Sequence, residues 1–100
     1  MTAGRNPERS LATAEEIAIK ALVFLAEDPE RLSRFLAETG MSPDDLRGKA
    51  GDRATLAAVL DHLLADESLL LVFTSNHAIG PETIGPALHA LAGRPPAWDT

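Results

Sequence analysis

Signals that start and stop helices recur at short intervals along this chain, and almost no strand pattern lies between them. Thr13 and Glu16 have the spacing of a capping box, in which each side chain bonds a backbone N–H group at a helix start. Asp28 precedes a proline, as expected for an N-cap residue followed by the first helical position, where no N–H group needs a partner. Gly40 suits the left-handed turn that ends a helix. The pattern predicts an all-α protein.

These signals divide the chain into five to seven short helices. We expect helices over residues 14–26 and 29–39, a third of about two turns from Pro43, and further helices over residues 53–65, 67–75 and 81–92. The ring of Pro86 would clash with the carbonyl four residues earlier, so the last of these should break at Gly85. We predict a compact orthogonal bundle: a flexible segment over residues 1–12, a single domain over 13–93 and an extended tail over 94–100.

The chain also resembles itself when it is shifted by 38 positions. The matching pairs are Leu22 with Leu60, Leu25 with Leu63, Asp28 with Asp66, Leu32 with Leu70, Phe35 with Phe73 and Pro43 with Pro81. They fall on apolar helix positions, on N-cap aspartates and on prolines that start helices, which two packed copies of one unit would share. Unrelated helices with similar loop lengths would align in the same way, so the sequence leaves both interpretations open.

The apolar faces of the helices differ in width. The fourth helix places Leu64 on an apolar face and Asp61 and His62 on a solvated one. The fifth helix carries apolar side chains in every direction, so either it forms the centre of the bundle or its extra face contacts another chain. The first helix has a similar excess beside Lys20. The candidate interface residues are Val23, Phe24, Leu69, Leu71 and Val72.

The charge balance argues against binding to nucleic acid or to an anionic membrane. Among 100 residues, 9 Lys and Arg face 15 Asp and Glu, which gives a net charge of −6. The turn at residues 39–46 resembles a helix-turn-helix, but Asp44 and Asp45 begin the next helix, where phosphates would have to lie. No apolar run approaches the roughly 20 residues that span a bilayer, and cysteine is absent. We expect a cytoplasmic protein.

The sequence has no residue pattern typical of a catalytic or metal site. Its three histidines, His62, His77 and His89, lack metal-ligand spacing. Its carboxylate pairs stand in first turns of helices, where acids stabilise the helix dipole. No nucleophile elbow and no glycine-rich phosphate loop is present. We expect no catalysis, no cofactor and no bound metal.

Three segments, D-P-E-R-L-S-R-F-L, G-M-S-P-D-D-L and L-L-A-D-E, occur in this order along the chain. With them, residues 13–92 resemble family 3572 of the domains of unknown function, a family of small bacterial helical proteins. The resemblance implies a single all-helical domain. It implies no activity and no catalytic residues.

We therefore expect a small non-catalytic protein-interaction module that binds a protein partner or associates with itself. Surplus aliphatic surface favours this function. The alternative is a small-molecule or metal-binding protein, or an enzyme, with a pocket between two helical halves. A concave site that brings together Asn76, His77 and a carboxylate would favour that alternative.

Overall fold

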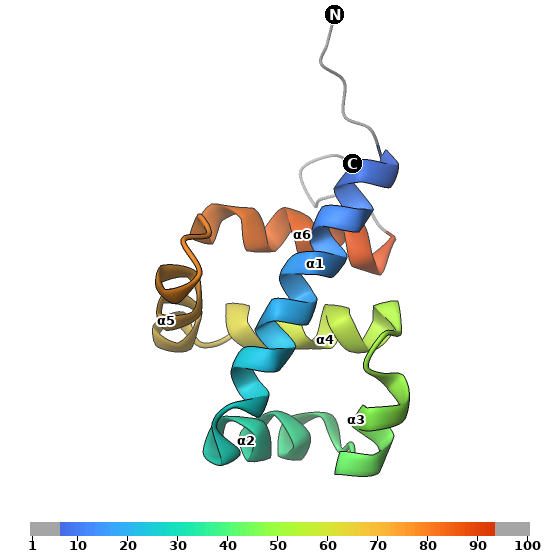
Figure 1. Cartoon of the computed structure of the whole chain (residues 1–100), viewed down its shortest axis with the longest axis vertical. Coiled ribbons are helices and arrows are strands. Elements are labelled where there is room, and N and C mark those ends of the chain that lie inside the picture. The colour runs from blue at the N-terminus through green and yellow to red at the C-terminus, as the bar shows by residue number, and fades with distance from the viewer. Residues whose placement is uncertain (1–6, 94–100) are drawn as a thin grey trace, which may run out of the picture.

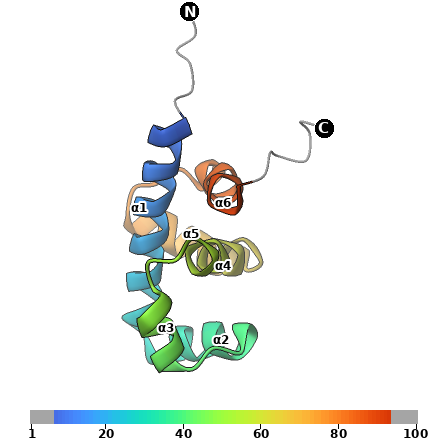
Figure 2. The same ribbon diagram turned by 90° about the vertical axis from the view of Figure 1, so that its right-hand side faces the viewer.

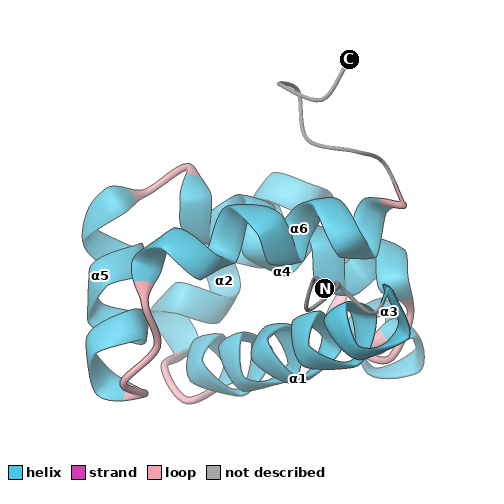
Figure 3. Cartoon of the chain, turned by 90° about the horizontal axis from the view of Figure 1, so that it is seen from above, coloured by secondary structure: helices cyan, strands magenta, loops and turns pink. Residues whose placement is uncertain are grey.

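The computed structural model describes residues 7–93, and every regular element in this part of the chain is helical (Figure 3). The elements are α1 (Pro7–Ala26), α2 (Pro29–Thr39), α3 (Pro43–Lys49), α4 (Arg53–Leu64), α5 (Glu67–Asn76), the 3₁₀ turn η1 (Pro81–Thr83) and α6 (Ile84–Ala92). The all-α fold that the sequence predicts is confirmed. The proposed tail at residues 94–100 and the first six residues of the proposed N-terminal segment lie outside the described residues.

Helices α2, α4 and α6 stack side by side, and α1 runs across all three (Figures 1 and 2). Helix α4 lies in the middle of the stack. Helices α3 and α5 turn the chain on opposite sides of the stack, with α3 connecting α2 to α4 and α5 connecting α4 to α6 (Figure 1). The crossing of α1 over the stack gives the predicted orthogonal arrangement.

The core forms where α1 crosses the stack. On this face of α1, Ala14, Ala18 and Ala21 are buried, and their small side chains let the crossing helices approach closely. Larger side chains fill the remaining interior: Phe24, Leu25, Phe35, Leu56, Val59, Leu60, Leu63, Phe73 and Ile84 are all buried. Because these residues join with Leu46 of α3 in one cluster, all six helices share a single core.

The first helix begins at Pro7 and not at Ala14. Thr13 therefore lies inside α1, so the predicted capping box is wrong, and residues 7–12 are helical where we expected a flexible segment. A proline suits the first helical position because that position needs no N–H donor. Packing stabilises the added segment, since its residue Leu11 packs against the core.

Pro86 does not break the last helix. The turn η1 ends at Thr83, and α6 runs without interruption from Ile84 through Gly85 and Pro86. In the first turn of a helix the backbone N–H groups have no helical partner, so the missing N–H of Pro86 removes no hydrogen bond. The predicted break at Gly85 is therefore wrong, and the change of helix type occurs at Ile84.

Helix α5 lies at the edge of the bundle and not at its centre (Figure 1). Its buried residues are Phe73 and Thr74, whereas Leu71 is 46% exposed and Val72 is 43% exposed. The central-helix interpretation is wrong because the interior is filled by the crossing of α1 with α4 and α6. The excess apolar side chains of α5 therefore face solvent.

The two halves of the chain, α1–α3 and α4–α6, share local geometry at positions related by the 38-residue shift. Asp28 and Asp66 cap α2 and α5 through their side-chain oxygens. The equivalent residues Gly40 and Ala78 both have a positive φ, of 74° and 53°. A left-handed alanine is uncommon, so its presence at this position supports the repeat.

The halves also exchange equivalent aromatic contacts. Phe24 of α1 packs against Phe73 of α5, with the ring centroids 5.4 Å apart. His62, the residue equivalent to Phe24, packs edge-on against Phe35 of α2, also with centroids 5.4 Å apart. Phe35 is itself equivalent to Phe73. The two halves therefore contact each other as the subunits of a symmetric dimer do, each giving the same position to the other.

Candidate functional site

The residues proposed as an interface lie in different environments. Phe24 is only 2% exposed and packs in the core, so its assignment to a contact surface is wrong. Leu69 is half-buried. Val23, Leu71 and Val72 are exposed, Val23 on α1 and the other two on α5.

His62 lies inside the protein and not on the solvated face expected for it. Its exposed fraction is 8%, whereas Leu64, which we placed on the apolar face, is 38% exposed. A helical wheel assumes one buried face. Helix α4 instead has neighbours on several sides, because α1 and α6 cover one face and α2 covers the face that carries His62.

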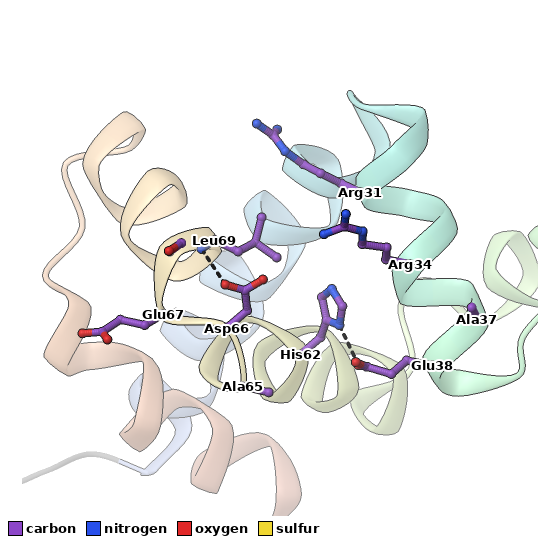
Figure 4. A pocket seen from close by; sticks show the side chains of 10 residues that line it. Arg31, Arg34, Ala37, Glu38, His62, Ala65, Asp66, Glu67 and Leu69 are labelled. Carbon is purple, nitrogen blue, oxygen red and sulfur yellow. Dashed lines mark hydrogen bonds and ion pairs between the residues drawn. The ribbon is translucent and has the colours of Figure 1, made fainter.

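A carboxylate from another helix holds the imidazole of His62. Nδ1 of His62 lies 2.7 Å from Oε1 of Glu38 in α2. An ionised carboxylate only accepts hydrogen bonds, so Nδ1 carries a proton and donates it. In the neutral ring Nε2 is then an acceptor. The edge of the ring that carries Nε2 faces the space between Arg34 and Asp66 (Figure 4).

A pocket of about 720 Å³ lies beside His62, between α2 and the junction of α4 with α5 (Figure 4). Its lining residues are Arg31, Arg34, Ala37, Glu38, His62, Ala65, Asp66, Glu67, Ser68 and Leu69. Small-molecule sites in proteins commonly measure about 300–1,000 Å³. Polar groups thus converge in a pocket between the halves, and they do so around His62, whereas Asn76 and His77 do not line this pocket.

Two arginines of α2 form one wall of this pocket. The guanidinium of Arg31 lies over the ring of Phe24, with Cζ 4.1 Å from the ring centroid. Its Nη1 also donates to the backbone carbonyl of Phe24 at 3.4 Å. These contacts fix the position of the Arg31 side chain. Arg34 follows one turn later and also lines the pocket.

Asp66, the N-cap residue of α5, forms the opposite wall with its carboxylate (Figure 4). Oδ1 of Asp66 accepts a hydrogen bond from the backbone N–H of Leu69 at 3.1 Å, which leaves its second oxygen for other partners. Glu67 follows directly, but its carboxylate points away from the pocket (Figure 4). The side chain of Leu69 adds apolar surface between the charged walls. The pocket therefore has a positive side, a negative side and an imidazole between them.

A second, shallower pocket of about 500 Å³ lies against α5 and the segment that follows it. Its lining residues are Leu71, Val72, Thr74, Ser75, Asn76, Ile79 and Pro81. At the positions of α2 equivalent to Leu71 and Val72 the chain has Ser33 and Arg34, which are also exposed. The fold thus accepts polar residues at these positions, and packing within the chain does not account for the aliphatic ones.

The loop histidine has a local structural role. His77 is the C-cap of α5, its N–H donates to the carbonyl of Phe73, and its ring centroid lies 4.8 Å from that of Phe73. Within residues 7–93, no group of three or more His, Asp or Glu side chains is placed to hold a metal ion. Over the same range, every helix is too short or too polar to cross a bilayer.

Residues 11–94 match the family described as protein of unknown function (DUF3572). The match includes α2 to α6 completely and most of α1. The chain belongs to this family. The resemblance drawn from its three sequence segments is thereby confirmed. Neither the curated proteins nor the solved structures contain a significant match to the chain.

Sequence reasoning missed Glu38 in this DUF3572 domain and assigned its partner His62 to solvent. The 38-residue shift offered a signal for His62, because it aligns His62 with Phe24, but no sequence signal indicated Glu38 as its partner. An imidazole at a position where the other half has a phenyl ring indicates a buried polar group, and such a group needs a specific partner.

Proposed function

We propose that this chain is a non-catalytic, cytoplasmic protein-interaction module that binds its partner through the outer face of α5. The exposure of Leu71 and Val72, where α2 has Ser33 and Arg34, carries the proposal. Aliphatic surface in water costs about 25 cal/mol per Å², which contact with a partner recovers. Since the fold accepts polar residues at these positions, a partner is the better explanation for aliphatic ones.

The charges around this face indicate the chemistry of the partner. Residues 54–93 include no Lys or Arg, and their acidic residues are Asp61, Asp66, Glu67 and Glu82. Glu67 precedes Leu71 by one helical turn, and Glu82 follows Pro81 of the shallow pocket. The partner is therefore an amphipathic segment of another protein, with aliphatic side chains flanked by Lys or Arg. Like charges oppose the approach of a second copy through the same face.

A synthetic peptide tests this proposal. The probe is an amphipathic helix of about 18 residues, with leucines at helical spacing and lysines elsewhere. Titrated into ¹⁵N-labelled protein, it should shift the backbone amide signals of α5 and Ile79. The double variant Leu71→Ser/Val72→Arg, which copies the residues of α2, should bind about tenfold more weakly or worse. A peptide with glutamate in place of lysine should bind the wild-type protein no more tightly than the lysine peptide binds the double variant.

A matched control removes exposed aliphatic surface elsewhere. Ile19→Ala copies Ala57, the equivalent residue of α4, and shortens a side chain that is 48% exposed on α1. Its affinity for the peptide should equal that of the wild type. Equal affinity in the double variant, or an absence of shifts, rejects the proposal. Sedimentation tests for self-association. If the wild type self-associates and the double variant does not, this face binds a second copy of the chain and the proposal of a basic partner is rejected.

A further inference from the structure

The polar pocket contains a buried imidazole that the fold does not require. His62 is 8% exposed, and its counterpart at the equivalent position is Phe24, which is 2% exposed. Both rings pack against a phenyl ring of the other half at the same centroid separation of 5.4 Å. A phenyl side chain therefore satisfies the packing at this position. The imidazole adds hydrogen-bonding capacity, and Glu38 orients it so that Nε2 faces the pocket (Figure 4).

The same comparison explains why the space beside His62 is open. In the first half, Arg31 lies over the ring of Phe24 and covers it. The residue equivalent to Arg31 is Leu69, which lines the pocket beside His62. Arg31 and Arg34 of α2 face this pocket from the other side. The second half thus lacks the covering arginine, and Arg34 of the first half lies at the opening.

The charges on the two walls select the ligand. The guanidinium of Arg34 suits a carboxylate, which it binds through paired N–H donors, whereas the guanidinium of Arg31 is already held by Phe24 and Asp28. Across the pocket, the carboxylate of Asp66 suits an ammonium group, and in the neutral ring Nε2 of His62 accepts a hydrogen bond from an N–H or O–H donor (Figure 4). The geometry points to a zwitterionic ligand of dipeptide size, with its carboxylate at Arg34 and its ammonium group at Asp66.

The pocket volume and its apolar residues agree with this ligand class. About 720 Å³ exceeds what a single amino acid needs and admits a dipeptide with both side chains. Ala37 and Ala65 leave room near the backbone, and Leu69 offers an aliphatic contact for a ligand side chain. This site uses the face between α2 and the start of α5, so it is separate from the outer face of α5 proposed above for a protein partner.

Leucyl-leucine and its two capped forms test the assignment. N-acetylation removes the ammonium group and C-terminal amidation removes the carboxylate, while the side chains stay the same. The free dipeptide should shift the amide signals of residues 31–38 and 62–69 in a saturable manner. Each capped form should bind about tenfold more weakly or worse, since each loses one charged contact. The absence of saturable shifts, or equal binding by either capped form, overturns the assignment.

Two variants copy residues that the other half already has at the equivalent positions. Arg34→Val reproduces Val72 on an exposed site, and His62→Phe reproduces Phe24 in the core. Both should weaken leucyl-leucine binding about tenfold or more and keep the helical circular dichroism of the wild type. Unchanged affinity in Arg34→Val overturns the proposal whether or not His62→Phe folds. The variant Leu71→Ser/Val72→Arg should bind the dipeptide as the wild type does, and weakened binding there counts against the pocket as the site.

Discussion

His62 occupies in α4 the place that Phe24 occupies in α1, and each ring lies 5.4 Å from a phenyl ring of the opposite half. Both positions are buried. The phenyl ring of Phe24 needs no hydrogen-bond partner, but the imidazole of His62 needs Glu38. Burial of the imidazole of His62 therefore costs desolvation free energy, whereas burial of the phenyl ring of Phe24 at the equivalent position does not.

This relationship predicts the effect of His62→Phe on stability. The substitution keeps an aromatic ring against Phe35 and removes a buried polar group, so the free energy of unfolding should stay within about 1.5 kcal/mol of the wild type or rise. His62→Ala instead leaves a cavity and should cost about 2–4 kcal/mol. Urea denaturation followed by circular dichroism measures both. A larger loss in His62→Phe than in His62→Ala would contradict the equivalence of the two positions.

Removal of the carboxylate should expose the dependence of His62 on its partner. Glu38→Ala leaves the buried Nδ1–H without an acceptor and should cost about 1–3 kcal/mol. In the His62→Phe background the same change should cost almost nothing, because the donor is gone. Glu27→Ala, at another exposed glutamate, serves as the control and should change stability by less than about 0.5 kcal/mol. Equal costs in both backgrounds would show that Glu38 acts on stability by another route.

The left-handed residues after α2 and α5 predict opposite effects of glycine and alanine. Ala78 has a φ of 53°, which strains a residue with a Cβ atom. Ala78→Gly should therefore stabilise the fold by about 0.5–1 kcal/mol, after the added freedom of the unfolded chain is subtracted. Gly40→Ala should destabilise it by a similar amount of about 1 kcal/mol. A Cβ atom at Gly40 would meet no neighbour, so conformational strain alone is measured there.

Asp45 predicts a dependence of stability on pH. The backbone N–H of Ser42 donates to its Oδ2 at 3.1 Å, and with smaller contributions from the Ser42 hydroxyl and Lys49 this lowers the pKa of Asp45. The stabilisation is present above the pKa of the unfolded chain and is lost as the pH falls through the lower pKa of the folded state. An NMR titration of the Asp45 carboxyl group should show this low pKa.

The serine hydroxyl provides the control for that titration. In Ser42→Ala the pKa of Asp45 should rise part of the way towards its ordinary value, because the backbone N–H donor remains. Asp45→Asn should lower the stability of the protein at neutral pH and have little effect under strongly acidic conditions, where the wild-type carboxyl group is protonated. An Asp45 carboxyl group that titrates at or above its ordinary value would contradict this account.

Helix ends were predictable wherever a local hydrogen bond decides them. Asp28 and Asp66 accept from backbone N–H groups of the helices they begin, and Gly40 adopts the left-handed conformation that its position required. The prediction failed where packing outweighs the local signal. Contacts of Leu11 with the core extend α1 towards the N-terminus, beyond the capping signal at Thr13, and the 3₁₀ turn before Ile84 places Pro86 where it removes no hydrogen bond.

The candidate interface residues were likewise predictable from the sequence only in part. The sequence marked Leu71 and Val72 as excess apolar residues, because helical spacing alone shows when one helix has more apolar residues than a single buried face needs. It could not separate Val23, which is exposed, from Phe24, which is buried. That choice depends on which neighbouring helix covers each side chain.

The sequence by itself determined the all-α class and the capped starts of α2, α3 and α5, since these depend on residues close together in the chain, and it offered the 38-residue repeat as one of two interpretations. Only the tertiary structure decided that α5 lies at the edge, that His62 is buried and that Glu38 is its partner. These facts depend on how α1 and α2 pack across α4, and contacts between distant segments leave no period in the sequence.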